Sequence, residues 1–185
     1  TAEPLPLGWT GKLWALEQGI RYAEKEIANI DYFLFTDADI QHEISNLQQL
    51  VTKAERESLD LVSLMVLLRC ESFWEQLLIP AFVFFFQKLY PFRLVNDRDR
   101  KTAAAAGGCI LIRKPILNRI GGIETISKAL IDDCALGQAV KANKGNIWLG
   151  LTQQTKSLRV YPSLNSIWDM VARTAYTQLR YSPWL

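Results

Sequence analysis

The sequence is short of the residue types that build metal clusters and disulfide frameworks. Its 185 residues include one histidine, His42, and three cysteines, Cys70, Cys109 and Cys134, none of them in a Cys-x-x-Cys pair. This scarcity excludes a zinc site of the cysteine–histidine type, and it favours a reducing environment in which all three cysteines are buried as small apolar side chains. The formal net charge of only +2 gives no reason to expect a nucleic-acid partner.

Long hydrophobic runs are also missing, because no stretch reaches the roughly 18 to 20 apolar residues that cross a bilayer. One segment, 77–92, comes part of the way, with ten consecutive apolar residues at 77–86. Two interpretations are open for it: a helix buried in the core, or an interfacial or re-entrant segment at a membrane, which would place a helix over 71–90 at the membrane surface. The apolar run 77–86 is flanked by residue types that lie at membrane–water interfaces, namely Trp74, Lys88, Tyr90 and Arg93.

Helix and strand patterns alternate along the chain, which predicts one domain of α/β architecture. Apolar residues at helical spacing predict helices over 11–29 and 44–54, and we expect two more helices over 133–143 and 163–180. Short apolar runs predict strands over 32–36, 59–66, 109–113, 147–151 and 156–160. A turn is expected at Gly121 and Gly122.

Two aspartates, Asp37 and Asp39, directly follow the strand predicted for 32–36. Residues i and i+2 of a strand point the same way, so both carboxylates can face one site past the end of the strand, where open α/β sheets bind ligands. Two carboxylates there suit Mg²⁺ or Mn²⁺, which takes its remaining ligands from water and a substrate phosphate. The alternative is that one of them caps a helix beginning near Glu43. His42, beside the pair, is expected to be only a surface neighbour.

A second acidic pair, Asp132 and Asp133, stands at the start of the helix predicted for 133–143. Carboxylates at that position are stabilised by the free amides and the helix dipole, so a capping role is one interpretation. The other is a general base that takes a proton from an attacking hydroxyl. The two side chains cannot point the same way on a helix, so at most one of them serves as the base.

Three other features suggest a binding site. Lys12 stands at a helix start, where cations are disfavoured, so it is either solvated or paired with a phosphate or carboxylate. Gly107 and Gly108 precede the strand at 109–113 and would let a ligand or another backbone approach closely. Arg180 lies among aromatic residues and is either a surface arginine or a clamp on pyrophosphate oxygens.

Taken in order, these motifs resemble those of family 2 glycosyltransferases of the GT-A fold. The run GKLWALEQG (11–19) resembles the GK-x-x-AL-x-x-G element of that family, and TDADI (36–40) resembles its DxD motif. The run GGI…IDDCAL (121–136) resembles the GG…ED-x-x-L element, with Asp132 in place of glutamate.

A fourth run, TQLRY (177–181), resembles the Q/R-x-x-RW motif but departs from it at Thr177 and Tyr181. The subgroup that the chain resembles is the hopene-associated glycosyltransferases, which are near the ceramide glucosyltransferases. Two segments carry this resemblance, CESFWEQLLIPAFVFFFQKLYPF and ARTAYTQLRYSP.

The resemblance implies a GT-A three-layer α/β/α sandwich with a mostly parallel mixed sheet, in a fragment that lacks the first βα units of the family. Residues 1–162 would form the catalytic domain, and 163–185 a terminal interfacial helix that leads toward a membrane region. The protein would act at the cytoplasmic face of the inner (plasma) membrane.

The implied activity is an inverting, metal-dependent hexosyl transfer from a nucleotide-diphosphate sugar, UDP-linked, to a membrane lipid acceptor such as a hopanoid. Two alternatives remain open: a sugar nucleotidyltransferase of related fold, and a membrane-surface module without turnover. The implied roles are Asp133 as the base; Asp39 and Asp37 as ligands of Mn²⁺ or Mg²⁺; Lys12 and Arg180, with the same two aspartates, as donor-binding residues; and Gly107, Gly108 and Asp132 as the border of the sugar and acceptor pocket.

Overall fold

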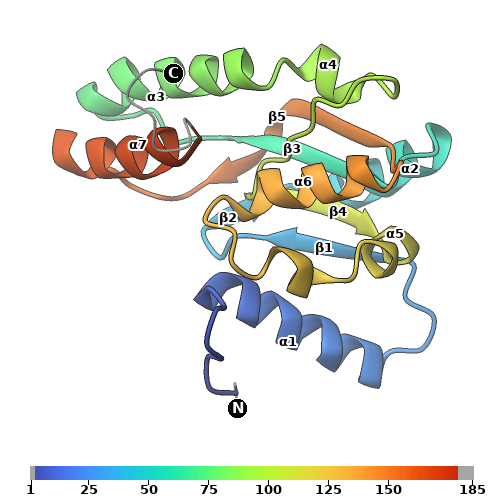
Figure 1. Cartoon of the computed structure of the whole chain (residues 1–185). Coiled ribbons are helices and arrows are strands. Elements are labelled where there is room, and N and C mark those ends of the chain that lie inside the picture. Colours follow the sequence, from blue (N-terminus) through green and yellow to red (C-terminus); the bar gives the residue numbers. More distant parts are fainter. Residues whose placement is uncertain (1–2, 179–185) are drawn as a thin grey trace.

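The structure is a computed structural model that describes residues 3–178 (Figure 1). Its elements occur in the order α1 (Gly11–Glu26), β1 (Tyr32–Thr36), β2 (Ile40–His42), α2 (Asn46–Arg56), β3 (Leu61–Leu67), α3 (Phe73–Leu89), α4 (Phe92–Asn96), β4 (Cys109–Arg113), α5 (Lys114–Arg119), the 3₁₀ helix η1 (Ile123–Ile126), α6 (Asp132–Ala142), β5 (Ile147–Ser157) and α7 (Leu164–Gln178).

The five strands form one mixed sheet in the order β1-β4-β3-β5-β2. Strand β4 lies between β1 and β3 and runs antiparallel to both, so that Ile112 is opposite Phe33 on one side and Leu61 on the other. Strands β3 and β5 are parallel, whereas β2 and β5 are antiparallel. The prediction of a mostly parallel sheet is therefore wrong. After β3 the chain passes through α3 and α4 and then forms β4. Strand β4 is inserted antiparallel between β1 and β3, which run in the same direction.

Helices cover both faces of this sheet, as the α/β prediction requires. One face carries Phe33, Ile110 and Leu149, which pack in a core with α1, α5, α6 and η1. The other face carries Val62 and Leu111, which pack with α2. Successive residues of each central strand alternate between the two cores, the pattern of a sheet buried on both sides.

The predicted helices agree with the structure to within three residues at each end that lies within residues 3–178; the end predicted at residue 180 lies outside the described residues. One prediction about strands is wrong: 147–151 and 156–160 are not separate, because β5 continues from Ile147 to Ser157. Its first part pairs with β3, and its last three residues pair with β2. The polar run 152–154, between the two predicted strands, is an exposed or half-exposed part of this long strand.

Helix α3 begins with a capping box in which the Ser72 hydroxyl accepts a hydrogen bond from the Glu75 amide. Glu75 is fully buried, and its carboxylate accepts hydrogen bonds from the backbone amides of Glu71, Ser72 and Tyr161. Arg69 Nη1 donates to both carboxylate oxygens, at 2.9 and 3.0 Å. Burial alone would raise its pKa, but these donors outweigh it and lower the pKa to about 2. The contact with Tyr161 ties the start of α3 to the segment between β5 and α7.

Helices α3 and α7 pack against each other and lie side by side at one end of the sheet (Figure 1). One face of α3 is in the core, with Ile79 and Phe86 buried, whereas Phe73, Leu77 and Phe84 on its other face are 71%, 54% and 60% exposed. The buried face agrees with the prediction of a core helix, and the exposed apolar face leaves the prediction of an interfacial helix open. Among residues 3–178, no helix is long and apolar enough to cross a membrane.

The three cysteines do not all behave as predicted. Cys109 and Cys134 are buried in the two cores, which confirms the prediction for them. Cys70 is exposed, so the prediction is wrong there, because this residue lies in the loop between β3 and α3.

Candidate functional site

The DxD residues lie in a turn that joins β1 to β2. Strand β1 ends at Thr36, and the Ile40 amide donates to the Asp37 carbonyl at 3.2 Å to close the turn. Strand alternation therefore does not orient the two carboxylates, contrary to the prediction. Neither caps α2, whose N-cap residue is Ser45.

Each aspartate of the turn forms an ion pair with a different basic side chain. Asp37 Oδ1 lies 2.9 Å from Lys12 Nζ, and Asp39 Oδ2 lies 2.8 Å from Arg159 Nε. Both aspartates border the same cavity, so they share a site even though they point to different partners.

Lys12 connects the two acidic motifs. Its Nζ is 2.9 Å from Asp37 and also 3.1 Å from Asp132 Oδ2. Burial alone would lower the pKa of Lys12, but the charge of Asp132 and the hydrogen bond and charge of Asp37 outweigh it and raise the pKa. Of the alternatives left open for this lysine, the structure shows pairing with carboxylates.

Asp133 is held by two backbone amides. Its Oδ2 accepts the Gly107 amide at 2.7 Å, and its Oδ1 accepts the Cys134 amide in the first turn of α6, also at 2.7 Å. Burial and the charge of Asp132 raise its pKa to about 6, although the two amides and Lys12 act in the opposite direction. Asp133 therefore binds a helix-start amide and also borders the cavity as a carboxylate of raised basicity.

Side chains lie close to both glycines. A Cβ added to Gly107 would lie 3.1 Å from Lys12 Nζ and 3.2 Å from Asp133 Oδ2, and one added to Gly108 would lie 2.9 Å from Val66. These neighbours are side chains, so the close approach of a ligand or another backbone to the glycines stays a prediction.

The segment leading to the glycines was not recognised from the sequence as part of the site. Residues Ala103–Ala106 are all buried, and a Cβ on Gly137 of α6 would lie 2.9 Å from the Ala104 backbone. Ser63 of β3 accepts the Ala106 amide at 2.8 Å. A run of four alanines and a buried serine were the available clues, because small residues allow this segment to lie directly beneath α6.

His42 is more than a surface neighbour, so that prediction is wrong. Its Nε2 lies 2.8 Å from Thr36 Oγ1, and its Nδ1 lies 3.0 Å from Asn46 Nδ2. Thr36 in turn donates to the Gly108 carbonyl at 3.0 Å. Burial lowers the pKa of His42. The imidazole thus joins the two ends of the DxD turn to the glycine loop.

Both aspartates of the turn, Lys12, the second acidic pair and the two glycines border a cavity of about 740 Å³. Its lining is partly charged and partly apolar. The charged lining residues are Lys12, Asp37, Asp39, Asp132, Asp133, Arg159 and Arg173, and the apolar ones include Met65, Val66, Leu68, Phe82, Phe86, Leu130 and Ile131. Phe82 and Phe86 belong to α3, so this helix forms part of the cavity wall.

Asp37 and Asp39 fit a divalent cation that also takes ligands from a substrate. No group of three or more candidate ligands occurs in the described part of the chain. The second carboxylate oxygen of each aspartate accepts no hydrogen bond from residues 3–178. Mg²⁺ is commonly held by one or two carboxylates, with phosphate oxygens and waters completing its shell, and this donor set meets that requirement.

Arg180, the remaining predicted site residue, lies outside the described residues. The other seven predicted site residues all line the same cavity: Lys12, Asp37, Asp39, Gly107, Gly108, Asp132 and Asp133. It adds Arg159, which no motif had indicated.

Residues 12–184 match the sequence profile of glycosyl transferase family 21, a ceramide glucosyltransferase-like family. No curated protein matches the chain. The match confirms the glycosyltransferase prediction and its link to ceramide glucosyltransferases, whereas the assignments to family 2 and to the hopene-associated group stay predictions. A glycosyltransferase uses a nucleotide-sugar donor and an acceptor. The profile spans nearly the whole sequence, and the chain belongs to glycosyl transferase family 21.

Proposed function

We propose that this protein transfers a sugar from a UDP-sugar, with inversion, to the hydroxyl group of a membrane lipid such as a hopanoid. The observation that carries the proposal is the cavity itself, which joins a cluster of carboxylates to an apolar wall formed partly by α3. The family match favours a glycosyltransferase over the two alternatives, a nucleotidyltransferase and a module without turnover.

Asp133 is the base in this proposal. Its raised pKa of about 6 keeps it largely ionised at pH 7 and still basic enough to take a proton from the acceptor hydroxyl. The amides of Gly107 and Cys134 hold one oxygen each, so the carboxylate keeps its orientation while the hydroxyl approaches. The hydroxyl oxygen then attacks the anomeric carbon from the side opposite the diphosphate, through a transition state of oxocarbenium character.

In this proposal the donor lies beside the charged residues that line the cavity. Asp37 and Asp39 would hold Mn²⁺ or Mg²⁺, and a cation bound there neutralises the charge that develops on the departing diphosphate. Lys12 keeps Asp37 and Asp132 together, so that both acidic motifs face the same space. Arg180 is expected to contact the diphosphate as well.

The apolar wall is suited to the acceptor. Phe82 and Phe86 on α3 face the cavity, whereas Phe73, Leu77 and Phe84 on the same helix are exposed. An interfacial α3 would lie in the headgroup region with its exposed face toward the lipid, and the cavity would then open beside the bilayer. The proposal places the lipid acceptor along α3, and it takes the cytoplasmic face of the inner membrane from the family resemblance.

The test uses full-length protein and measures UDP release from several UDP-sugars with Mn²⁺, in the presence of hopanoid or polyprenol acceptors in vesicles. Release should depend on both Mn²⁺ and the lipid acceptor, and a water-soluble alcohol should replace the lipid poorly. Asp39→Ala should weaken metal-dependent donor binding by about tenfold or more. An unchanged metal dependence in this variant would remove Asp39 from the site, and release without any acceptor would contradict the transferase assignment.

A further inference from the structure

Arg159 lies where the segment after β5 passes the DxD turn. Its Nε is 2.8 Å from Asp39 Oδ2, and its side chain borders the cavity. The backbone there is held independently of this ion pair, because the Leu158 amide donates to the Asp39 carbonyl at 2.8 Å and Ser157 pairs with Ile40 between β5 and β2. The guanidinium can therefore change partner while its backbone stays beside Asp39.

This ion pair is easily exchanged. The Arg159 side chain is 54% exposed and that of Asp39 is 27% exposed, and an ion pair with one solvent-exposed partner stabilises a fold only modestly. A divalent cation bound to Asp39 would repel the guanidinium, since both are positively charged. The planar fork of arginine matches phosphate oxygens as well as carboxylate oxygens, so a diphosphate arriving with the cation offers it a new partner.

We propose that Arg159 exchanges partners when the donor binds. Before binding it holds Asp39; when Asp39 takes a divalent cation, Arg159 turns to the β-phosphate of the nucleotide diphosphate. The inference rests on the proposed function, because it requires a cation-bound nucleotide diphosphate in the cavity. Arg159 is then a positioning residue for Asp39, and it also makes the site select diphosphates over monophosphates.

The experiment is calorimetric titration of full-length wild-type protein and Arg159→Ala with Mn²⁺ alone, and with UDP or UMP at saturating Mn²⁺. Arg159→Ala should bind Mn²⁺ about threefold more tightly, because Asp39 loses a competing cation. It should bind UDP about tenfold more weakly, with UMP changed by less than about twofold. If the substitution only disordered the site, the binding of Mn²⁺, UDP and UMP would all become weaker.

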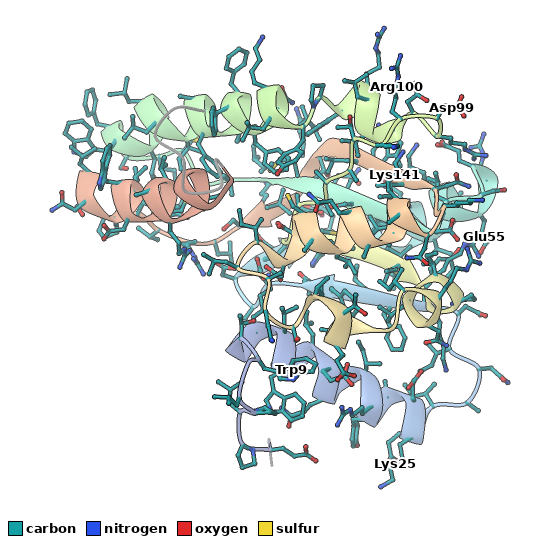
Figure 2. The ribbon with its side chains drawn as sticks, viewed as in Figure 1. Trp9, Lys25, Glu55, Asp99, Arg100 and Lys141 are labelled. Atoms are coloured by element: carbon teal, nitrogen blue, oxygen red, sulfur yellow. The ribbon has the colours of Figure 1, made fainter. Side chains whose placement is uncertain are left out.

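Two further variants sharpen the test. Arg159→Lys keeps the charge but not the fork, so it should return Mn²⁺ affinity to the wild-type value and still discriminate poorly between UDP and UMP. Arg100→Ala is the matched control: Arg100 is an exposed arginine in the loop after α4, 3.7 Å from Asp97 (Figure 2), and its loss should change none of the affinities.

The exchange is overturned if Arg159→Ala leaves Mn²⁺ affinity unchanged or lower, or if it weakens UDP and UMP equally. A wild-type protein without Mn²⁺-dependent UDP binding would contradict the proposed function itself, and the exchange with it. These two failures are distinguishable, because the first appears only in the variant.

Discussion

The amide nitrogen of Gly107 lies 2.7 Å from Oδ2 of Asp133, although 26 residues separate them in the chain. This contact fixes the carboxylate at the start of α6 against the loop that enters β4. It also makes a side chain at Gly107 a tight fit, because a Cβ there would lie 3.2 Å from the carboxylate oxygen. The position of the proposed base thus depends on a residue that has no side chain.

Replacing the base should stop transfer without removing the donor. We expect Asp133→Asn to lower the rate of sugar transfer by about a thousandfold, because an amide cannot take the proton of the acceptor hydroxyl. UDP affinity with Mn²⁺ should stay within about twofold of the wild-type value. Asp99→Asn, an exposed aspartate in the loop after α4 (Figure 2), is the control and should transfer normally. Transfer at the wild-type rate by Asp133→Asn would show that another group is the base.

The pH dependence of transfer should report the raised pKa of Asp133, which is about 6. The base must be ionised, so the rate should be level above this pH and fall about tenfold per unit of pH below it. Asp132→Asn removes the neighbouring negative charge that helps to raise this pKa, so it should move the acidic limb to lower pH. Initial rates measured between pH 4.5 and 8 would check this; a limb that does not move would assign it to a different group.

A methyl group at Gly107 should disturb the site more than the fold. We expect Gly107→Ala to reduce the transfer rate by about tenfold, because its Cβ would press on Lys12 Nζ and Asp133 Oδ2 at 3.1 and 3.2 Å. Gly19→Ala is the control, since a Cβ there meets nothing within 4 Å inside α1, and alanine is favoured over glycine in a helix by about 1 kcal/mol. Thermal melts and initial rates of both variants would separate stability from activity. If the loss of activity in Gly107→Ala were fully explained by a lower melting temperature, the effect would not be local to the site.

The buried carboxylate of Glu75 should stabilise the junction of α3 with the segment that leads to α7. Glu75→Gln should lower the free energy of unfolding by about 3 kcal/mol, because it leaves Arg69 without its buried partner. Glu71→Gln is the control: Glu71 also pairs with Arg69 but is largely exposed, and its loss should cost about 0.5 kcal/mol or less. Urea denaturation at pH 7 would measure both.

Glu75 also gives a pH dependence of stability with a definite sign. Its pKa is lowered in the fold, to about 2 from the ordinary value of 4.5, so its stabilising contribution is present above about pH 4.5 and is lost as the pH falls toward 2. The difference in unfolding free energy between wild type and Glu75→Gln should therefore shrink over this range. A difference that stays constant with pH would show that the glutamate charge is not what stabilises the junction.

The exposed face of α3 should bind membranes. We expect Leu77→Ser combined with Phe84→Ser to reduce binding to anionic vesicles by about tenfold or more, since each change removes an exposed apolar side chain that would be buried in the interface. Ile44→Ser is the control, because Ile44 is fully exposed in the loop before α2. Vesicle sedimentation of the wild-type protein and both variants would measure the effect. Equal binding by wild type and the double variant would remove α3 as the contact surface.

Much of the fold followed from local patterns. The apolar run 109–113 became β4 at the predicted residues, and the helical spacing after Gly11 became α1. These predictions succeed because strand alternation and helical periodicity depend on neighbouring residues. The two halves of β5 were predicted as separate strands, and their continuity is seen only in the pairing with β3 and β2, which are distant in the chain.

The sequence by itself determined the residue types of the site, the order of its motifs and the helices and strands that carry them. Only the tertiary structure decided that β4 lies between β1 and β3, that Lys12 joins Asp37 to Asp132, and that Arg159 holds Asp39. The physical reason is range: local conformation depends on residues a few positions apart, whereas strand order and ion pairing depend on groups that meet only when the whole core packs.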